Sequence, residues 1–182
     1  EEMTPAPLSP YAVGKLAGEH YCKIFSCLFN LPCVALRYFN VFGARQDPRS
    51  QYAAVIPNFF KALCAGTAPV IDGDGEQSRD FTYVRNVAEA NLRALEAPLR
   101  GGEVMNIACG TAVSVNALYR MVGETLGVSI PPRRGAPRPG DVRHSLADIS
   151  RAKELLGLAP AIGIEEGLRL AAPYYREMYR AG

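Results

Sequence analysis

A short apolar run between a predicted helix and a polar loop constrains the fold of this chain most. Residues 33–39 are rich in strand-forming side chains, follow a helix predicted over residues 10–29, and lead into a loop predicted over residues 40–52. Strands that alternate with helices pair in parallel, because a parallel partner is reached through a long crossover connection. Such strands are apolar on both faces. The run therefore predicts one strand of a parallel sheet covered by helices.

The remainder of the chain continues this alternation. Further helices are predicted over residues 53–65, 86–96, 114–126, 149–156 and 165–179. Strands or extended segments are predicted over residues 70–71, 79–84 and 103–107, and the Pro- and Arg-rich residues 133–140 are predicted to be a loop. Mixed elements in this order predict a layered α/β fold.

The composition argues against several classes of protein. The 182 residues carry 20 Lys and Arg against 18 Asp and Glu, a balance that points neither to nucleic acid nor to an anionic membrane surface. No apolar run approaches the ~20 residues that span a bilayer. The five cysteines are odd in number and form no Cys-x-x-Cys pair, so we expect reduced, buried thiols in a cytoplasmic protein without a metal site.

Tyr11 and Lys15 form a candidate catalytic pair. Ser9 is a candidate helix cap and Pro10 a favourable first residue, so both side chains fall in the first turns of the predicted helix. Residues four apart share one face of a helix. An ammonium group beside a tyrosine favours the phenolate, which can take a proton from a hydroxyl group. Tyr and Lys at this spacing also occur by chance in many helices, and that alternative stays open.

Two further side chains lie where open α/β sheets bind ligands, beyond the carboxyl ends of strands. Asn40 directly follows the predicted strand, and its amide offers a donor and an acceptor; an ordinary turn asparagine is the alternative. Arg79 follows a glycine turn at residues 73–75, and its guanidinium could hold a phosphate through two hydrogen bonds. A surface salt bridge of Arg79 with Asp80 or Glu76 is the alternative.

A second arginine lies in the Pro- and Arg-rich loop. Arg138 and Asp141 are three residues apart around a glycine, a spacing suited to a pyrophosphate and a ribose diol respectively. His144 follows closely, but no carboxylate is paired with it in the sequence, so a structural role is favoured over that of a general base.

These segments, in this order, resemble the C-terminal portion of extended short-chain dehydrogenase/reductases, the NAD-dependent epimerase/dehydratase family, and most of all its UDP-N-acetylglucosamine and UDP-glucose 4-epimerases. The likeness covers nearly the whole chain. The segments that carry it are residues 7–15, 36–48, 52–57, 73–76, 78–81 and 140–145.

The resemblance implies an α/β architecture: the C-terminal part of a Rossmann-type doubly wound fold plus a smaller α/β substrate-binding domain. Residues 1–45 would end the NAD-binding domain, and residues 46–182 would bind the sugar nucleotide, with a possible return to the Rossmann sheet around residues 80–110. The family's N-terminal half, with its glycine-rich loop and a catalytic Ser or Thr, is not in this chain, and Thr4 and Ser9 lie too close to Tyr11 to replace that residue. We expect a longer parent protein, and we expect these residues alone to bind NAD poorly and to be inactive.

The resemblance also implies residue roles. Tyr11 would be the catalytic base, Lys15 would bind the nicotinamide ribose of NAD, and Tyr38 and Phe39 would flank the nicotinamide. The implied substrate-binding residues are Asn40 near the diphosphate, Ala54, Val55, Val70 and Asp72 near the uridine, Arg79 and Arg138 on the diphosphate, Asp141 on the ribose, and Ser145 beside the sugar. A residue as small as Ser145 would leave room for an N-acetyl group.

The implied activity is NAD-dependent epimerisation at C4 of a UDP-hexose or UDP-N-acetylhexosamine, through removal and return of hydride and a 4-keto intermediate. A nucleotide-sugar 4,6-dehydratase or UDP-glucuronate decarboxylase is an alternative within the family. A non-catalytic sugar-nucleotide-binding or dimerisation module is an alternative of another class. The resemblance also implies a homodimer, in which the helix of Tyr11 and Lys15 joins a four-helix interface. Leu16, Ile24 and Leu28 follow a helical spacing that suits such an interface, and packing of this stripe on the domain's own sheet fits equally well.

Overall fold

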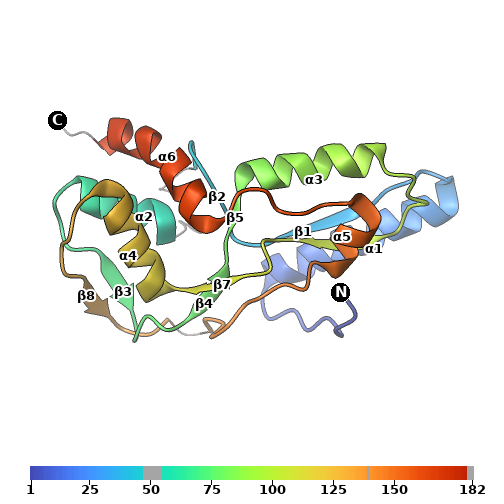
Figure 1. Cartoon of the computed structure of the whole chain (residues 1–182). Helices are drawn as coiled ribbons and strands as arrows, with labels where there is room; N and C mark the ends of the chain where they lie inside the picture. The colour runs from blue at the N-terminus through green and yellow to red at the C-terminus, as the bar shows by residue number, and fades with distance from the viewer. Residues whose placement is uncertain (47–54, 139, 180–182) are drawn as a thin grey trace.

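The computed structural model describes residues 1–46, 55–138 and 140–179 (Figure 1). Its helices are α1 (Pro10–Phe29), α2 (Val55–Cys64), α3 (Val84–Glu96), α4 (Val115–Leu126), α5 (Ser150–Leu156) and α6 (Ile164–Tyr179). Its strands are β1 (Ala35–Tyr38), β2 (Val41–Phe42), β3 (Val70–Asp72), β4 (Ser78–Asp80), β5 (Thr82–Tyr83), β6 (Val104–Ile107), β7 (Ala112–Ser114) and β8 (Arg133–Gly135). The α/β class predicted from the sequence is confirmed.

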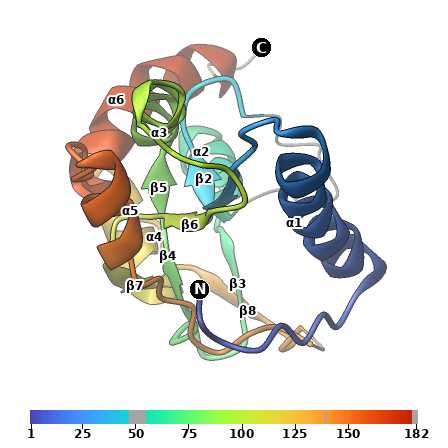
Figure 2. The ribbon, with the colours of Figure 1, turned by 90° about the vertical axis from the view of Figure 1, so that its right-hand side faces the viewer.

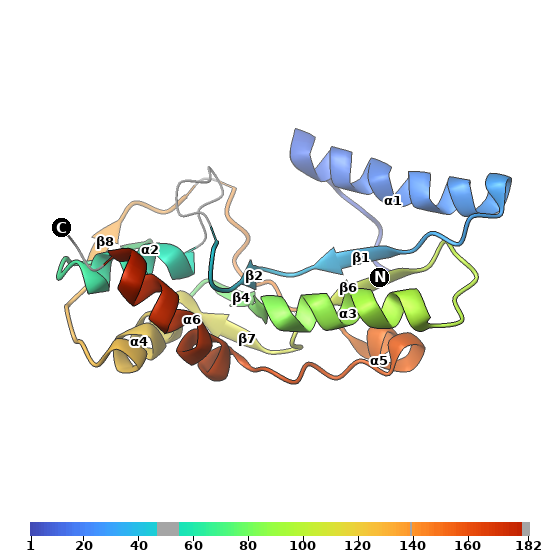
Figure 3. The same cartoon turned by 90° about the horizontal axis from the view of Figure 1, so that it is seen from above.

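The predicted strand within residues 33–39 is β1, and its parallel pairing is confirmed. It pairs with β6 over its whole length, so that Ala35 lies opposite Val104 and Tyr38 opposite Ile107. Helices α3 and α5 pack with these two strands in one apolar cluster (Figure 3). The buried members of this cluster are Val87, Ala90, Met105, Ile107, Ala152, Leu156 and Leu158. Burial of these side chains fixes β1 and therefore the loop that leaves it.

A second apolar core joins α2, α4 and α6 at the other end of the molecule (Figure 1). Tyr175 of α6 is fully buried there, stacks on Phe60 with ring centroids 4.6 Å apart, and donates a hydrogen bond of 2.9 Å to the carbonyl oxygen of Gly43. Gly167 allows α6 to approach the strands, because a Cβ atom there would lie 2.6 Å from Cζ of Phe42. The C-terminal helix thus supports the segment that follows β2.

Two segments predicted to be loops contain short strands. Val41–Phe42 forms β2 and pairs in parallel with β5, and Arg133–Gly135 forms β8 and pairs in parallel with β3. Runs of two or three residues are too short to show an alternating pattern of their own. Their partners, which are distant in sequence, determine that they are extended.

Helix α1 stands beside the rest of the molecule (Figures 2 and 3). Its start agrees with the sequence, because the Ser9 hydroxyl accepts a hydrogen bond from the Ala12 amide and Pro10 is the first helical residue. None of its residues is buried, and Ile24 and Leu28 are exposed. Leu16, the third residue of this apolar stripe, is half-buried, so contacts within the described residues cover the stripe only at its start.

The prediction of buried cysteines was wrong. All five cysteines are free; Cys27 is exposed and the others are half-buried. Two of them, Cys22 and Cys27, lie on α1, which has no buried residue.

The described residues contain neither a helix suited to crossing a membrane nor a cluster suited to a metal ion. Their helices are too short or too polar to span a bilayer. Their His, Cys, Asp and Glu side chains form no group of three or more that could ligate a metal.

Candidate active site

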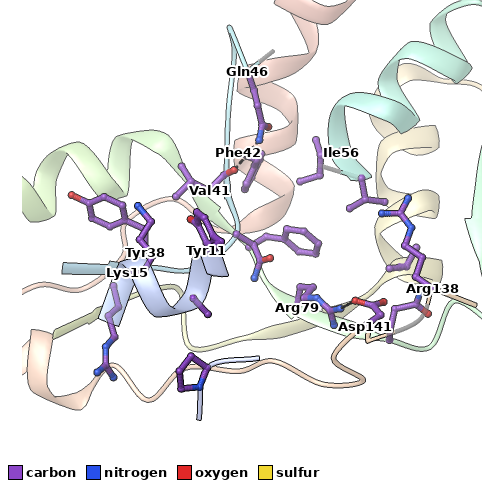
Figure 4. Close-up of a pocket in the computed structure, with 18 of the residues that line it drawn as sticks. Tyr11, Lys15, Tyr38, Val41, Phe42, Gln46, Ile56, Arg79, Arg138 and Asp141 are labelled. Atoms are coloured by element: carbon purple, nitrogen blue, oxygen red, sulfur yellow. Dashed lines mark hydrogen bonds and ion pairs between the residues drawn. The ribbon is translucent and has the colours of Figure 1, made fainter. Parts of the chain in front are cut away.

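A large cavity, with a volume of about 1380 Å³, is lined by most of the candidate residues, which come from separate elements (Figure 4). The candidate residues that line it are Tyr11, Lys15, Tyr38, Asn40, Val55, Val70, Asp72, Arg79, Arg138 and Asp141. Tyr11, Lys15 and Tyr38 lie at one end, and Arg79, Asp141 and Arg138 lie at the other. The fold thus places the candidate acid–base pair and the candidate phosphate-binding arginines around one space.

The helical spacing of Tyr11 and Lys15 brings the two side chains together as expected. The Lys15 ammonium lies 5.3 Å from the centroid of the Tyr11 ring, within the range of a cation–π contact. Tyr11 is 57% exposed, so a ligand in the cavity can reach it. Tyr38 lies beside this pair and donates a hydrogen bond of 3.0 Å from its hydroxyl to Oδ1 of Asn91 on α3. The bond fixes the aromatic ring at the mouth of the cavity.

Glu19 continues the face of α1 that carries Tyr11 and Lys15, one turn further on, and it binds Arg37 of β1. The Arg37 guanidinium donates from Nε to Oε1 and from Nη2 to Oε2 of Glu19, both at 2.7 Å. The hydrogen bonds from Arg37 hold the pKa of Glu19 below its ordinary value, and those to Glu19 raise the pKa of Arg37. Both residues line the cavity, and both were missed from the sequence. The spacing of Tyr, Lys and Glu at intervals of four is the signal that could have identified Glu19.

Asn40 is held in a strained turn at the end of β1. Its φ of 31° is left-handed, and its Nδ2 donates to the carbonyl oxygen of Asp80 at 3.0 Å. The buried Asp80 carboxylate in turn accepts hydrogen bonds of 2.9 Å from the amides of Cys109 and Gly110. Asn40 therefore has the turn role that the sequence allowed, while it also lines the cavity.

Gln46 is a further polar residue of the cavity wall that was missed from the sequence. Its Nε2 donates to the carbonyl oxygen of Val41 at 3.2 Å, which leaves the amide oxygen facing away from that bond (Figure 4). The buried Oε1 has no hydrogen-bond partner among the residues that the structure describes. A buried acceptor without a partner is costly.

The two candidate phosphate-binding arginines are paired with carboxylates. Arg79 forms an ion pair with Asp141, and Nε of Arg138 lies 2.5 Å from Oδ2 of Asp72. The alternative pairing of Arg79 with Asp80 or Glu76 was wrong, because the Asp80 carboxylate binds the amides of Cys109 and Gly110 and the Glu76 carboxylate binds Asn116. The Arg79 side chain is 17% exposed, whereas that of Arg138 is 70% exposed. An anionic ligand such as a phosphate could bind the two guanidinium groups in place of the Asp141 and Asp72 carboxylates.

Two candidate residues within the described part of the chain, Phe39 and Ser145, are not part of the cavity wall. Phe39 packs with Ala108, Ala147 and Ile149 and does not line the cavity. Ser145 is half-buried, and its amide donates to the carbonyl oxygen of Ser78 at 3.1 Å. Ala54 lies outside the described residues.

His144 does not line the cavity and contacts Ser78 of another segment. Its Nδ1 lies 2.9 Å from the hydroxyl oxygen of Ser78, next to a β-bridge between the same two residues. This bond ties the segment after β8 to β4.

Comparison with known proteins agrees with this geometry. The sequence model of the NAD dependent epimerase/dehydratase family matches residues 1–108. The chain belongs to this family. Similarity to individual relatives covers more of the chain than the family model does. The chain is 38% identical to a UDP-glucose 4-epimerase of Mycolicibacterium smegmatis over 97% of this chain and 56% of that protein.

Solved structures of epimerases are similar over nearly the whole chain. A UDP-N-acetylglucosamine 4-epimerase of Methanobrevibacter ruminantium, solved with UDP-N-acetylmuramic acid, has a TM-score of 0.93 and 43% identity over 98% of this chain and 57% of that one. A UDP-glucose 4-epimerase of Thermotoga maritima, solved with UDP-glucose, has a TM-score of 0.90 and 41% identity over 96% and 55%. The predicted Rossmann-type fold is confirmed by these similarities. The chain spans just over half the length of these relatives.

Proposed function

We propose that this chain carries the acid–base pair and the sugar-nucleotide site of a UDP-sugar 4-epimerase. The observation that carries the proposal is the one cavity that extends from Tyr11 and Lys15 to Arg79 and Arg138 (Figure 4). Similar structures were solved with UDP-sugars, which combine a diphosphate with a reactive sugar. The cavity has cations at one end and a proton-transfer pair at the other, as such a ligand requires.

The arginines bind the part of the substrate that does not react. Arg79 and Arg138 pair with the diphosphate, which replaces the carboxylates of Asp141 and Asp72, and Asp141 then accepts hydrogen bonds from the uridine ribose. Asn40, Val55 and Val70 complete the contacts with the nucleotide. Binding energy from this remote part orients the sugar at the other end of the cavity.

The Tyr11 end of the cavity suits the nicotinamide end of NAD, the cofactor that gives the family its name. Lys15 has no ion pair within the described part of the chain, so its ammonium is available to ribose hydroxyls, and Tyr38 offers a half-exposed ring held by Asn91. NAD, when bound, supplies the acceptor and donor of hydride. Tyr11 would take the proton from the C4 hydroxyl when the C4 hydrogen leaves as hydride, and it would return the proton to the C4 oxygen when hydride is delivered to the other face of the 4-keto sugar.

The activity belongs to a protein longer than this chain. We assign residues 1–45 to the end of a dinucleotide-binding domain, to which β6 and α3 return, and most of residues 46–182 to a sugar-nucleotide domain. The two separate apolar cores support this division. Because the chain spans about 56% of its relative and has no glycine-rich fingerprint, these residues alone are expected to bind NAD weakly and to be inactive. Tight NAD binding in a fluorescence titration of the 182 residues would contradict this.

A homodimer is part of the same proposal. The exposed side chains of Ile24, Leu28 and Phe29 on α1 form an apolar surface that a second copy of the helix would cover. Light scattering of the complete protein tests this, and a monomer at micromolar concentration would exclude it.

A dehydratase is the second candidate, because the family that the chain matches includes dehydratases by name. The two reactions differ in product, since epimerisation conserves every atom of the sugar whereas dehydration loses water. The complete protein, loaded with NAD, is incubated with UDP-glucose and UDP-N-acetylglucosamine, and the products are identified by NMR. A parallel incubation contains UDP-glucuronic acid. Inversion at C4 is expected; a 4-keto-6-deoxy product from the first two substrates, or loss of carbon dioxide from UDP-glucuronic acid, would replace the proposal by one of its alternatives.

A further inference from the structure

We propose that Arg37 is a positioning residue, which holds the Glu19 carboxylate away from Lys15 and so leaves the Lys15 ammonium at Tyr11. The inference rests on the proposed function, because the Tyr11–Lys15 pair is the one that it protects. The sequence of α1 gives Lys15 two competing partners. Tyr11, Lys15 and Glu19 are spaced four residues apart on one face of α1, so Lys15 has an aromatic hydroxyl residue one turn before it and a carboxylate one turn after it.

The conflict is electrostatic. Lys and Glu at positions i and i+4 attract each other on a helix surface. The Glu19 side chain is only 18% exposed, and a carboxylate in such a place strongly requires a cation. Without another partner, Glu19 would compete with Tyr11 for Lys15, because the long lysine side chain can turn toward either end of the helix.

Arg37 resolves this conflict by occupying both oxygen atoms of Glu19. Its Nε and Nη2 each donate to a different carboxylate oxygen at 2.7 Å, in the parallel arrangement that matches the two flat groups. The Lys15 ammonium meanwhile lies 5.3 Å from the centroid of the Tyr11 ring. Arg37 of β1 thus neutralises the Glu19 carboxylate, and the Lys15 ammonium remains beside Tyr11.

The position of Arg37 is itself fixed. It lies in the middle of β1, opposite Asn106 of β6. Asn106 is bound in turn, since its Nδ2 donates to the carbonyl oxygen of Asp148 at 3.1 Å. The guanidinium therefore reaches α1 from a strand whose register is set by backbone pairing.

Lys23, one turn beyond Glu19, is the other cation on this face. Its stem packs over Gly102, where a Cβ atom would lie 3.5 Å from Cγ of Lys23, and Lys23 does not line the cavity. Lys15 does line the cavity with Glu19, so it is the cation that Glu19 would capture there.

The test compares variants of the complete protein loaded with NAD, assayed with a UDP-sugar. Arg37→Met leaves Glu19 without its partner, and kcat is expected to fall roughly 10- to 100-fold with KM nearly unchanged, because a misplaced catalytic group slows the chemical step rather than remote binding. Glu19→Gln removes the competitor and is expected to keep kcat within about threefold of the unmodified enzyme. The double variant Glu19→Gln/Arg37→Met is expected to recover most of the kcat that Arg37→Met loses.

A merely structural ion pair gives a different pattern, because either single change breaks the same pair. Equal losses in Glu19→Gln and Arg37→Met, with no recovery in the double variant, would overturn the inference. A crystal structure of Arg37→Met provides a readout besides activity, and it is expected to place Nζ of Lys15 within hydrogen-bond distance of the Glu19 carboxylate. Lys15 unmoved from Tyr11 in that structure would also overturn it.

Two controls separate this inference from the proposed function. Arg93→Met breaks the exposed pair of Arg93 with Glu89 on α3, which does not line the cavity, and it is expected to leave kcat unchanged. Tyr11→Phe is assayed in parallel. Turnover retained by Tyr11→Phe would refute the proposed function, whereas loss in Tyr11→Phe together with equal behaviour of the Arg37 and Glu19 variants would refute only the role of Arg37.

Discussion

The ammonium of Lys15 lies over the ring of Tyr11, 5.3 Å from its centroid, so two side chains one helical turn apart meet in the wall of a cavity that is lined at its other end by arginines. The contact follows from helix geometry alone, because residues i and i+4 lie above one another. Its place in the molecule does not, since the cavity is built from β1, α2, β3 and β4 as well as α1.

Tyr11→Phe separates the ring from the hydroxyl. Phenylalanine keeps the aromatic face beneath Lys15 but cannot transfer a proton, so kcat of the complete enzyme is expected to fall on the order of 10²- to 10⁴-fold, the range of acid–base catalysis. The affinity for UDP is expected to change little, because the arginines that bind the diphosphate are unaltered. Steady-state kinetics and calorimetry with UDP measure the two effects.

Tyr21→Phe is the matched control for this prediction. Tyr21 lies on the same helix, is 64% exposed and does not line the cavity. Its variant is expected to keep full activity, and a comparable loss in both variants would indicate that the helix, and not the Tyr11 hydroxyl, had been disturbed.

The local features of the site could be predicted from the sequence, whereas its long-range pairs could not. The Ser9 cap, the extent of α1 and the parallel strand β1 all depend on neighbouring residues, and the structure confirms them. The partner of Arg79 lies 62 residues away at Asp141, and nothing near Arg79 in sequence identifies it. The same holds for β8, whose extended conformation depends on β3.

Phe39 shows another limit of prediction from a motif. The motif places Tyr38 and Phe39 together in sequence, but only Tyr38 lines the cavity, whereas Phe39 packs on a small apolar cluster formed with Ala108, Ala147 and Ile149. These partners lie about 70 to 110 residues further along the chain, so the local sequence does not identify them.

The two arginines are expected to contribute unequally to UDP binding. Arg79 is largely buried, and a charged hydrogen bond in such a place is worth about 1.5–3 kcal/mol, so Arg79→Lys is expected to weaken UDP binding about 10- to 100-fold. Arg138 is mostly exposed, where an ion pair is worth about 0–1 kcal/mol, so Arg138→Lys is expected to weaken it by at most about fivefold. Calorimetry with UDP at constant ionic strength measures both constants.

Arg143→Lys is the control for these two variants, because Arg143 is bound to Asp74 outside the cavity wall. No change in UDP affinity is expected for it. Equal losses at Arg79 and Arg138 would contradict the ranking by exposure.

Gly167→Ala is expected to destabilise the fold. A methyl group at this position would lie 2.6 Å from Cζ of Phe42 and 3.0 Å from Cδ2 of Tyr83, both of which are buried and cannot move aside. Overpacking of this kind costs about 1–3 kcal/mol, and the higher helix propensity of Ala offsets up to about 1 kcal/mol of it. Urea unfolding of the chain is therefore expected to show a net loss.

Gly14→Ala provides the opposite case. Nothing lies within 4 Å of a Cβ atom at Gly14, in the second turn of α1, so the variant is expected to be no less stable than the unmodified chain. A loss at Gly14 as large as that at Gly167 would show that the close approach of α6 to Phe42 is not the cause.

The pKa of Asp74 is expected to report its pairing with Arg143. Arg143 donates to both carboxylate oxygens at 2.9 and 2.7 Å, and together with the Glu76 amide it lowers the pKa of Asp74 from 3.8 to about 2. Because the folded state lowers this pKa, the stabilisation is fully present above about pH 4 and is lost as the pH falls toward 2. Carboxyl NMR is expected to give a pKa near 2 for Asp74, and a pKa closer to 3.8 in the variant Arg143→Gln.

Arg134→Gln is the control for this prediction. Arg134 donates to the backbone carbonyl oxygen of Asp74 rather than to its carboxylate, so this variant is expected to keep the low pKa. An ordinary pKa in the unmodified chain would mean that the pair does not persist in solution.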